Sequence, residues 1–153
     1  MGRTDRARLL IHRDRAEVFA ALVDQQALLR WLPPRGMQGR FLGFDMREGG
    51  SYRLELRYLD ASGAPGKSSA DSDVSEVHIL RIVPGERIVQ EVRFESTDPS
   101  LEATMQMEWS LHSSDAGTDV EIVARDVPDG IRASEHAAGI TSSLANLAGY
   151  LEP

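Results

Sequence analysis

Four histidines are the side chains of this sequence best suited to acid–base chemistry or to binding a metal. They are His12, His78, His112 and His136, and none has a second histidine within four residues, as a His-Glu-x-x-His metal pair requires. We therefore predict no metal site. Glu135 precedes His136, which would act as a general base if it were buried beside a carboxylate. A histidine that faces solvent or has satisfied hydrogen bonds is the more common case.

Other motifs of catalysis are missing from the sequence. It contains no Gly-x-Ser-x-Gly elbow, no Gly-x-Gly-x-x-Gly fingerprint and no P-loop. Asp71-Ser72-Asp73 resembles the start of a calcium loop, but Glu76 stands where that loop needs glycine, so we interpret it as a solvated turn. We assign no catalytic residue and no cofactor, and the candidates that remain are His136, His78 and Tyr52.

Aromatic, methionine and polar side chains together favour a site for a small molecule. Such sites are apolar cavities with a few polar groups, for which Tyr52, Gln90, His78 and His136 are suitable. Met105 and Met107 beside Trp109 would make an adaptable wall. Packing in an ordinary core is the alternative for each of these residues. We expect the following residues to line a pocket: Trp31, Met37, Phe44, Tyr52, Leu56, His78, Phe94, Met105, Met107, Trp109, His136 and Ile140.

Length, charge and composition narrow the class of protein. The 153 residues fit a single domain over 1–153, with 41% hydrophobic and 27% charged residues. A formal net charge of -7 argues against nucleic acid as a partner. Cysteine is absent, and no apolar run suits a signal peptide or a membrane span, so we expect a cytoplasmic protein.

Periodicity predicts two short helices after a first strand over 6–12. Asp14 is placed to cap a helix that runs to about residue 24. A second helical turn over 25–30 leads to Pro33 and Pro34, which end it, and we expect a loop from residue 35.

Alternating apolar residues predict an antiparallel meander of about six strands, with an edge strand that would permit a homodimer. Ala61–Asp73 is rich in Gly, Ser, Pro and Asp and is interpreted as a mobile connection. The strands are expected at 51–58, 77–83, 87–95, 103–111 and 118–125.

A helix of about 30 Å over 131–151 closes the chain. Ile140, Leu144, Leu147 and Leu151 recur at the spacing of one buried face, so this helix must cover the sheet. The predicted fold class is α+β, with helices on one face of the sheet.

Three segments carry a family resemblance: RAEVFAALVDQQALLRWLPP, FDMREGGSYRLEL and HAAGITSSLANLAGYLE. In this order they resemble the START-like superfamily, in the branch of homologues of the activator of Hsp90 ATPase. The resemblance implies a helix-grip fold, in which a curved sheet surrounds the C-terminal helix and a cavity lies between them. The family's usual pattern has Trp at the position of Ile140 and often Gly at that of Val77. The smaller Ile140 should leave more room at the helix.

The resemblance leaves three functions open, because a fold does not select a function. The first, which we favour, is binding of a small apolar or amphipathic molecule of lipid, polyketide or aromatic type. The second is a cyclase-like or hydrolytic enzyme that uses His136 or His78 with Tyr52 or Glu135. The third is a protein-interaction module like the co-chaperone that names the family.

Overall fold

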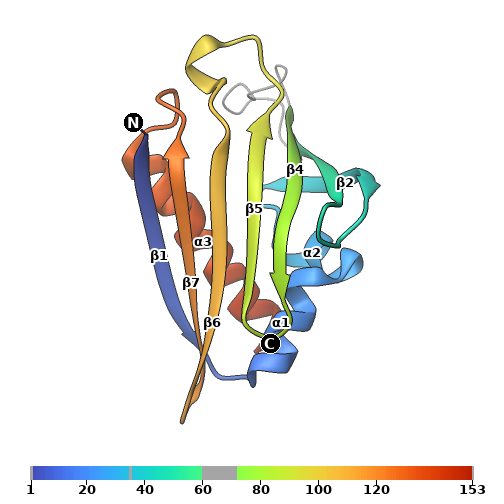
Figure 1. Ribbon diagram of the computed structural model, residues 1–153, viewed down its shortest axis with the longest axis vertical. Helices are drawn as coiled ribbons and strands as arrows, with labels where there is room; N and C mark the ends of the chain where they lie inside the picture. The colour runs from blue at the N-terminus through green and yellow to red at the C-terminus, as the bar shows by residue number, and fades with distance from the viewer. Residues whose placement is uncertain (1, 35, 60–71, 153) are drawn as a thin grey trace.

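The computed structural model of the chain is a curved antiparallel sheet of seven strands with its helices on the inner side (Figure 1). It describes residues 2–34, 36–59 and 72–152. The strands are arranged in the order β1-β7-β6-β5-β4-β3-β2, so β1 and β2 are the edges. The elements are β1 (Arg3–Ile11), α1 (Arg15–Val23), α2 (Gln25–Trp31), β2 (Met37–Phe44), β3 (Ser51–Tyr58), β4 (Ser72–Val83), β5 (Arg87–Phe94), a 3-10 turn (Pro99–Leu101), β6 (Met105–Ser114), β7 (Gly117–Val127) and α3 (Ala133–Leu151).

Aspartates cap the two short helices, as the sequence predicts for the first of them. The carboxylates of Asp14 and Asp24 each accept a hydrogen bond of 2.8 Å from the backbone amide three residues further on. The indole Nε1 of Trp31 donates a hydrogen bond of 2.9 Å to the carbonyl oxygen of Ala21. This bond fixes α2 against α1 and holds the Trp31 ring inside the protein.

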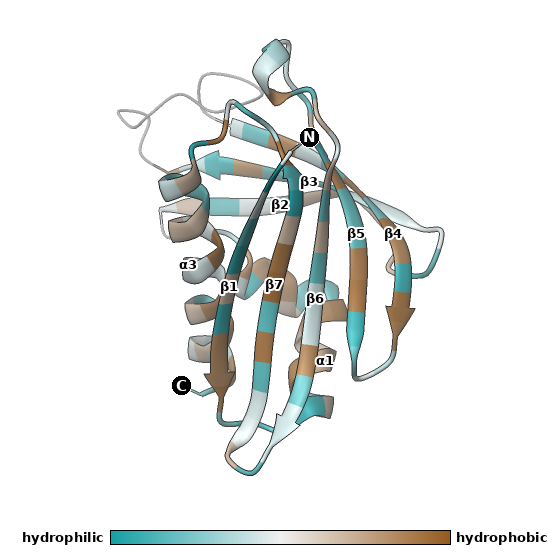
Figure 2. Cartoon of the chain, turned by 60° about the vertical axis from the view of Figure 1, so that its left-hand side comes forward, coloured by the Kyte–Doolittle hydropathy of each residue, from teal (hydrophilic) through white to brown (hydrophobic). Residues whose placement is uncertain are grey.

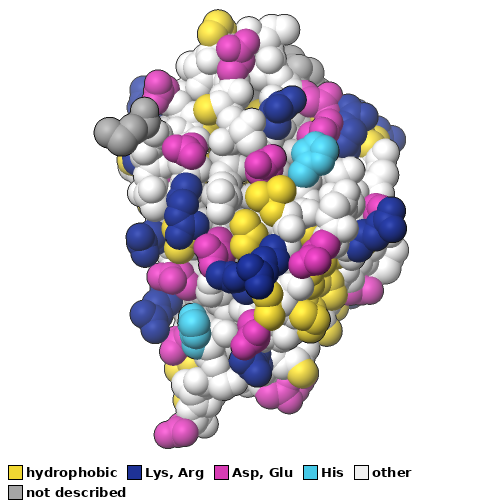
Figure 3. Space-filling model, in the orientation of Figure 1, with side chains coloured by type: hydrophobic (Ala, Val, Ile, Leu, Met, Phe, Trp, Pro, Cys, Tyr) yellow, Lys and Arg dark blue, Asp and Glu magenta, His cyan; other side chains and the backbone are white. Residues whose placement is uncertain are grey.

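The strands alternate between an apolar inner face and a charged outer face. Figure 2 shows this as brown and teal bands that follow one another along β5 and β7. Figure 3 shows the outer face, where acidic and basic side chains lie interspersed. Arg53 pairs there with Glu95 at 2.7 Å, and Arg87 and Arg125 both pair with Glu108.

Two strands differ from the sequence-based expectation. Residues 37–44, expected in a loop, form β2, and β4 begins at Ser72, within the expected connection. Residues 61–71 of that connection lie outside the described residues. Gly39 and Gly43 break the apolar alternation of β2, and a Cβ at Gly39 would lie 2.9 Å from the Cγ of Pro33. Because β2 packs closely against the proline segment, it has glycine where an apolar side chain would otherwise mark the strand in the sequence.

Helix α3 packs across the inner face and completes the core. Ile140, Leu144 and Leu147 are buried on it, and Leu151 is half-buried, so the predicted apolar stripe is confirmed. The helix begins at Ala133, two residues later than expected. Burial of each stripe residue stabilises the fold by about 1.5–3 kcal/mol. The architecture is the predicted helix-grip arrangement.

Candidate functional site

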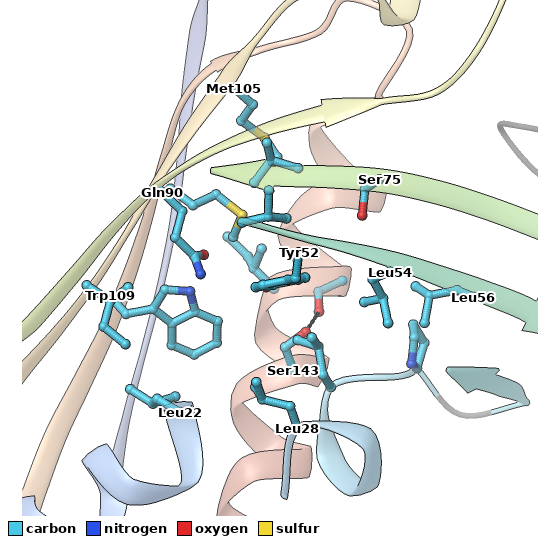
Figure 4. Close-up of a pocket in the computed structure, with 18 of the residues that line it drawn as sticks. Leu22, Leu28, Tyr52, Leu54, Leu56, Ser75, Gln90, Met105, Trp109 and Ser143 are labelled. Carbon is cyan, nitrogen blue, oxygen red and sulfur yellow. Dashed lines mark hydrogen bonds between the residues drawn. The ribbon is translucent and has the colours of Figure 1, made fainter. Parts of the chain in front are cut away.

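A cavity of about 240 Å³ lies between the sheet and the N-terminal half of α3. Strands β3, β4, β5 and β6 supply one wall, α1 and α2 supply the floor in the view of Figure 4, and α3 supplies the opposite wall. An apolar cavity of about 150 Å³ is large enough to hold benzene. The cavity of this protein therefore has room for a larger ring compound.

The structure brings nine of the twelve expected pocket residues together around this cavity. Trp31 and Trp109 meet edge to face, with ring centroids 5.5 Å apart. Ile140, where the family usually has Trp, is on the α3 wall. The nine are Trp31, Tyr52, Leu56, Phe94, Met105, Met107, Trp109, His136 and Ile140.

The other three expected residues, Met37, Phe44 and His78, lie elsewhere. Met37 borders a shallow depression between the proline segment and the end of α3. Phe44 stacks on the far side of Tyr52, with ring centroids 5.7 Å apart, and does not line the cavity. His78 is exposed and pairs with Glu76 at 2.6 Å, because the buried Val77 and Ile79 on either side turn it to the outer face. Contrary to expectation, His78 does not face the cavity.

Several lining residues were not among those expected from the sequence. Most are aliphatic side chains that complete the apolar wall, and the alternation of β3, β4 and β5 would have identified those on strands. Ser143 also lines the wall, and its hydroxyl donates to the carbonyl oxygen of Gly139 at 3.1 Å (Figure 4). The additional residues are Leu22, Leu28, Leu32, Pro34, Leu54, Ser75, Val77, Ile88, Val92, Gly139 and Ser143. Gln90, which the sequence suggests as a polar group of the cavity, also lines it.

Tyr52 and Gln90 form a polar spot inside the apolar cavity. They come from β3 and β5, and both are more than nine-tenths buried. Figure 4 shows both side chains projecting from the sheet among Met105, Trp109 and Leu54. Burial raises the pKa of Tyr52 to about 12, and the side-chain amide of Gln90 partly offsets this rise. The phenol is therefore neutral at physiological pH and can donate a hydrogen bond to a ligand.

A second polar group, made of His136, Asp5 and Arg3, lies where α3 meets β1. The imidazole Nδ1 of His136 is 2.7 Å from Oδ2 of Asp5, and the guanidinium Nε of Arg3 is 2.9 Å from Oδ1. Burial by itself would raise the pKa of Asp5, but the hydrogen bonds from Arg3 and His136 outweigh it and bring the pKa below its ordinary value. Asp5 is therefore ionised at neutral pH.

Asp5 was not identified from the sequence, although a signal exists. Ala7, Leu9 and Ile11 follow it at every second position of β1 and face α3. The same alternation places the Asp5 carboxylate on the inner face of the sheet. An acidic residue at such a position needs a partner, and His136 together with Arg3 supplies it.

The arrangement can bind and orient a small molecule by apolar contact and a few hydrogen bonds. Of the residues considered for an enzyme, His136 and Tyr52 line the cavity, whereas His78 is on the other face of the sheet and Glu135 is exposed. Among residues 2–34, 36–59 and 72–152, no three His, Asp or Glu side chains come together as metal ligands.

Comparisons with known proteins agree with this geometry. Protein CV1439 from Chromobacterium violaceum is 32% identical, with a TM-score of 0.86 over 98% of this chain and 97% of that one. MLL2253 from Mesorhizobium loti is 17% identical, with a TM-score of 0.75 over 98% and 97% of the two chains. DynU16, from the dynemicin biosynthetic locus, is 20% identical, with a TM-score of 0.71 over 97% of this chain and 47% of that one. No curated protein matches.

A curved sheet around a C-terminal helix, with a cavity between them, defines a START-like protein of helix-grip fold. The family model "Activator of Hsp90 ATPase homolog 1-like protein" matches residues 12–152, and the chain belongs to that family. None of the helices that the structure describes is long and apolar enough to cross a membrane.

Proposed function

We propose that this protein binds a small apolar molecule in the cavity between the sheet and α3. The observation that supports the proposal is the cavity itself, about 240 Å³ and walled mainly by aliphatic, aromatic and methionine side chains. Sites for small molecules usually combine such a wall with a few polar groups that fix orientation. Tyr52 and Gln90 supply those groups here.

The size of the cavity favours a compact ring compound over a long-chain lipid. Cavities for drug-sized ligands usually measure about 300–1,000 Å³, and this one lies just below that range. Trp31 and Trp109 offer aromatic faces and edges, while Met105 and Met107 adapt to irregular shapes. Aromatic polyketides and other fused-ring molecules are therefore the preferred class within the wider set of apolar ligands.

The other two functions have less support. An enzyme needs polar groups that act together on a substrate. His78 and Glu135 are exposed, and the hydrogen-bond partners of His136 and Tyr52 are Asp5 and Gln90 rather than each other. A protein-interaction surface would be a large apolar patch. The large hydrophobic side chains that are exposed in the described residues lie on four separate segments, at Leu42, Leu59, Leu80 and Tyr150.

Two measurements test the proposal. Native mass spectrometry of the purified protein should reveal a bound small molecule that is released on denaturation. A thermal-shift series with fused-ring aromatics and with fatty acids should raise the melting temperature with the first group more than with the second. If no compound of either group stabilises the protein and none is carried through purification, the proposal is wrong.

A further inference from the structure

His136 differs from the other histidines that pair with a carboxylate. His12 lies 3.0 Å from Glu152 and His78 lies 2.6 Å from Glu76, and these two histidine side chains are 61% and 51% exposed. The His136 side chain is 13% exposed and its Asp5 partner 9%. Of these three histidines, His136 alone lines the cavity.

The partners of Asp5 determine which way the hydrogen bond to His136 runs. Arg3 donates to both carboxylate oxygens of Asp5, through Nε at 2.9 Å and Nη2 at 3.0 Å. An ionised carboxylate only accepts hydrogen bonds, so Nδ1 of His136 must carry the proton and donate it. In the neutral imidazole the other nitrogen, Nε2, then has a free lone pair and is an acceptor.

The position of the ring directs that acceptor away from β1. Nδ1 is bonded to Asp5 on β1, so Nε2, on the opposite side of the ring, is the nitrogen available to a ligand in the cavity that His136 lines. Within the described ranges, no side chain or backbone group forms a hydrogen bond with Nε2. Arg3 also donates to the carbonyl oxygen of Ile131 at 2.7 Å, which fixes the segment that leads into α3.

We propose that Nε2 of His136 accepts a hydrogen bond from the hydroxyl group of a ring compound bound in the cavity, with Asp5 as the positioning residue. The proposal rests on the proposed function and adds a chemical class to it. The ligand is a phenol, an enol or a comparable hydroxylated ring. Tyr52 and Gln90, at the polar spot, can bind a second polar atom of the same molecule.

Three related probes test this inference by titration at pH 8. Naphthalene measures apolar binding alone, 2-naphthol adds a hydroxyl donor, and 2-methoxynaphthalene keeps the oxygen but cannot donate. We expect 2-naphthol to bind the wild-type protein about fivefold to tenfold more tightly than either of the others, as one neutral hydrogen bond predicts. Equal binding of all three probes would overturn the inference and leave the proposed function intact.

Variants test whether the preference for 2-naphthol depends on His136 and Asp5. His136→Phe keeps a flat ring without an acceptor and should remove the preference for 2-naphthol, while naphthalene still binds. His78→Phe, at an exposed pair, should keep the full preference. Asp5→Ala should reduce the preference without weakening naphthalene. Retention of the preference in His136→Phe would show that Tyr52 or Gln90 recognises the hydroxyl, and would overturn the inference.

A measurement on the wild-type protein covers the case in which His136→Phe fails to fold. The nitrogen-15 signal of Nε2 in His136 should shift by several times more on addition of 2-naphthol than on addition of 2-methoxynaphthalene, whose ring current alone acts on it. A shift with saturating 2-naphthol no larger than that with 2-methoxynaphthalene would contradict the inference. If not even naphthalene binds the wild-type protein, the proposed function fails and this inference fails with it.

Discussion

The two halves of α3 face different surroundings, although they belong to one continuous helix. The C-terminal half is closed: Leu144 and Leu147 are 1% and 0% exposed, pack with Ile11 and Val18 and do not line the cavity. In the N-terminal half, His136 and other residues face the cavity. One half thus holds the fold together, and the other leaves space against the same sheet.

This difference shows how a stable fold can contain an incompletely filled interior. The closed half supplies enough apolar burial to keep α3 docked, so the N-terminal half need not be packed to full density. The cavity beside the N-terminal half instead includes polar side chains, among them Tyr52, Gln90 and His136. Changes in the closed half should therefore affect stability, and changes in the cavity half should affect binding.

The largest effect is expected from a charge in the closed half. Leu144→Asp places a carboxylate at a position that is 1% exposed and has only apolar neighbours in the core cluster, so the variant should not fold. Leu144→Ala should remain folded but lose about 2–5 kcal/mol of unfolding free energy. Circular dichroism and urea denaturation measure both effects.

Ala145→Asp is the matched control for the charge, because Ala145 is the next residue along α3 and is exposed. It should unfold at nearly the same urea concentration as the wild-type protein. A folded Leu144→Asp variant with unchanged stability would contradict the assignment of this half to the core.

Alkaline pH should destabilise the protein through Tyr52, which lines the cavity from β3. Its pKa of about 12 in the folded protein exceeds the ordinary value of 10.0, so the unfolded state loses this proton first. Stability is fully present below pH 10 and falls as the pH rises toward 12, by up to about 3 kcal/mol. Tyr52→Phe should lose less stability over this range in urea denaturation at each pH. Identical slopes for the two proteins would contradict a neutral buried phenol.

Acid should weaken the protein through Asp5. Because the folded pKa lies below 3.8, the contribution of Asp5 is present above about pH 4 and is lost as the pH falls through the folded value. Asp5→Asn should cost about 1.5–3 kcal/mol at pH 7, the usual range for hydrogen bonds to charged groups. The difference between wild type and variant should shrink below pH 4. A difference that stays constant down to pH 2 would exclude the ionised pair.

Ile140→Trp should have the smallest effect on stability and a large one on binding. The larger ring fills part of the cavity at its α3 wall, so the unfolding free energy should fall by about 1 kcal/mol, the low end of the cost of a larger side chain in a core. Naphthalene should bind at least about tenfold more weakly, as measured by fluorescence titration. Ala145→Trp, on the exposed side of α3, should bind naphthalene normally. Undiminished binding by Ile140→Trp would locate the site elsewhere.

Most of the fold could be predicted from the sequence, because its elements have clear periods. The cap at Asp14 and the apolar stripe on α3 depend only on the spacing of nearby residues, which can be read from the sequence. Strand β2 could not be predicted from local spacing. Its Gly39 packs so closely against Pro33 that a larger side chain would not fit, and this contact joins two separate segments of the chain. The start of β4 was missed since Ser72 and Asp73, which composition assigns to a loop, are buried in the sheet.

The site was less predictable than the fold. Strand alternation places Met105, Met107 and Trp109 among the inner residues, but it does not say which inner residues leave a space. His78 was misplaced even though its apolar neighbours in the strand turn it outward. The pairing of His136 with Asp5 joins residues 131 positions apart, and no local pattern specifies such a contact.

Methionine methyl NMR tests the central claim most directly, because methionines lie both at the cavity and away from it. Met105 and Met107 line the cavity, whereas Met37 and Met46 do not. Titration with naphthalene should shift the methyl signals of Met105 and Met107 in a saturable manner and leave those of Met37 and Met46 in place. No saturable shift at Met105 and Met107, or shifts confined to Met37 and Met46, would contradict a ligand site between the sheet and α3.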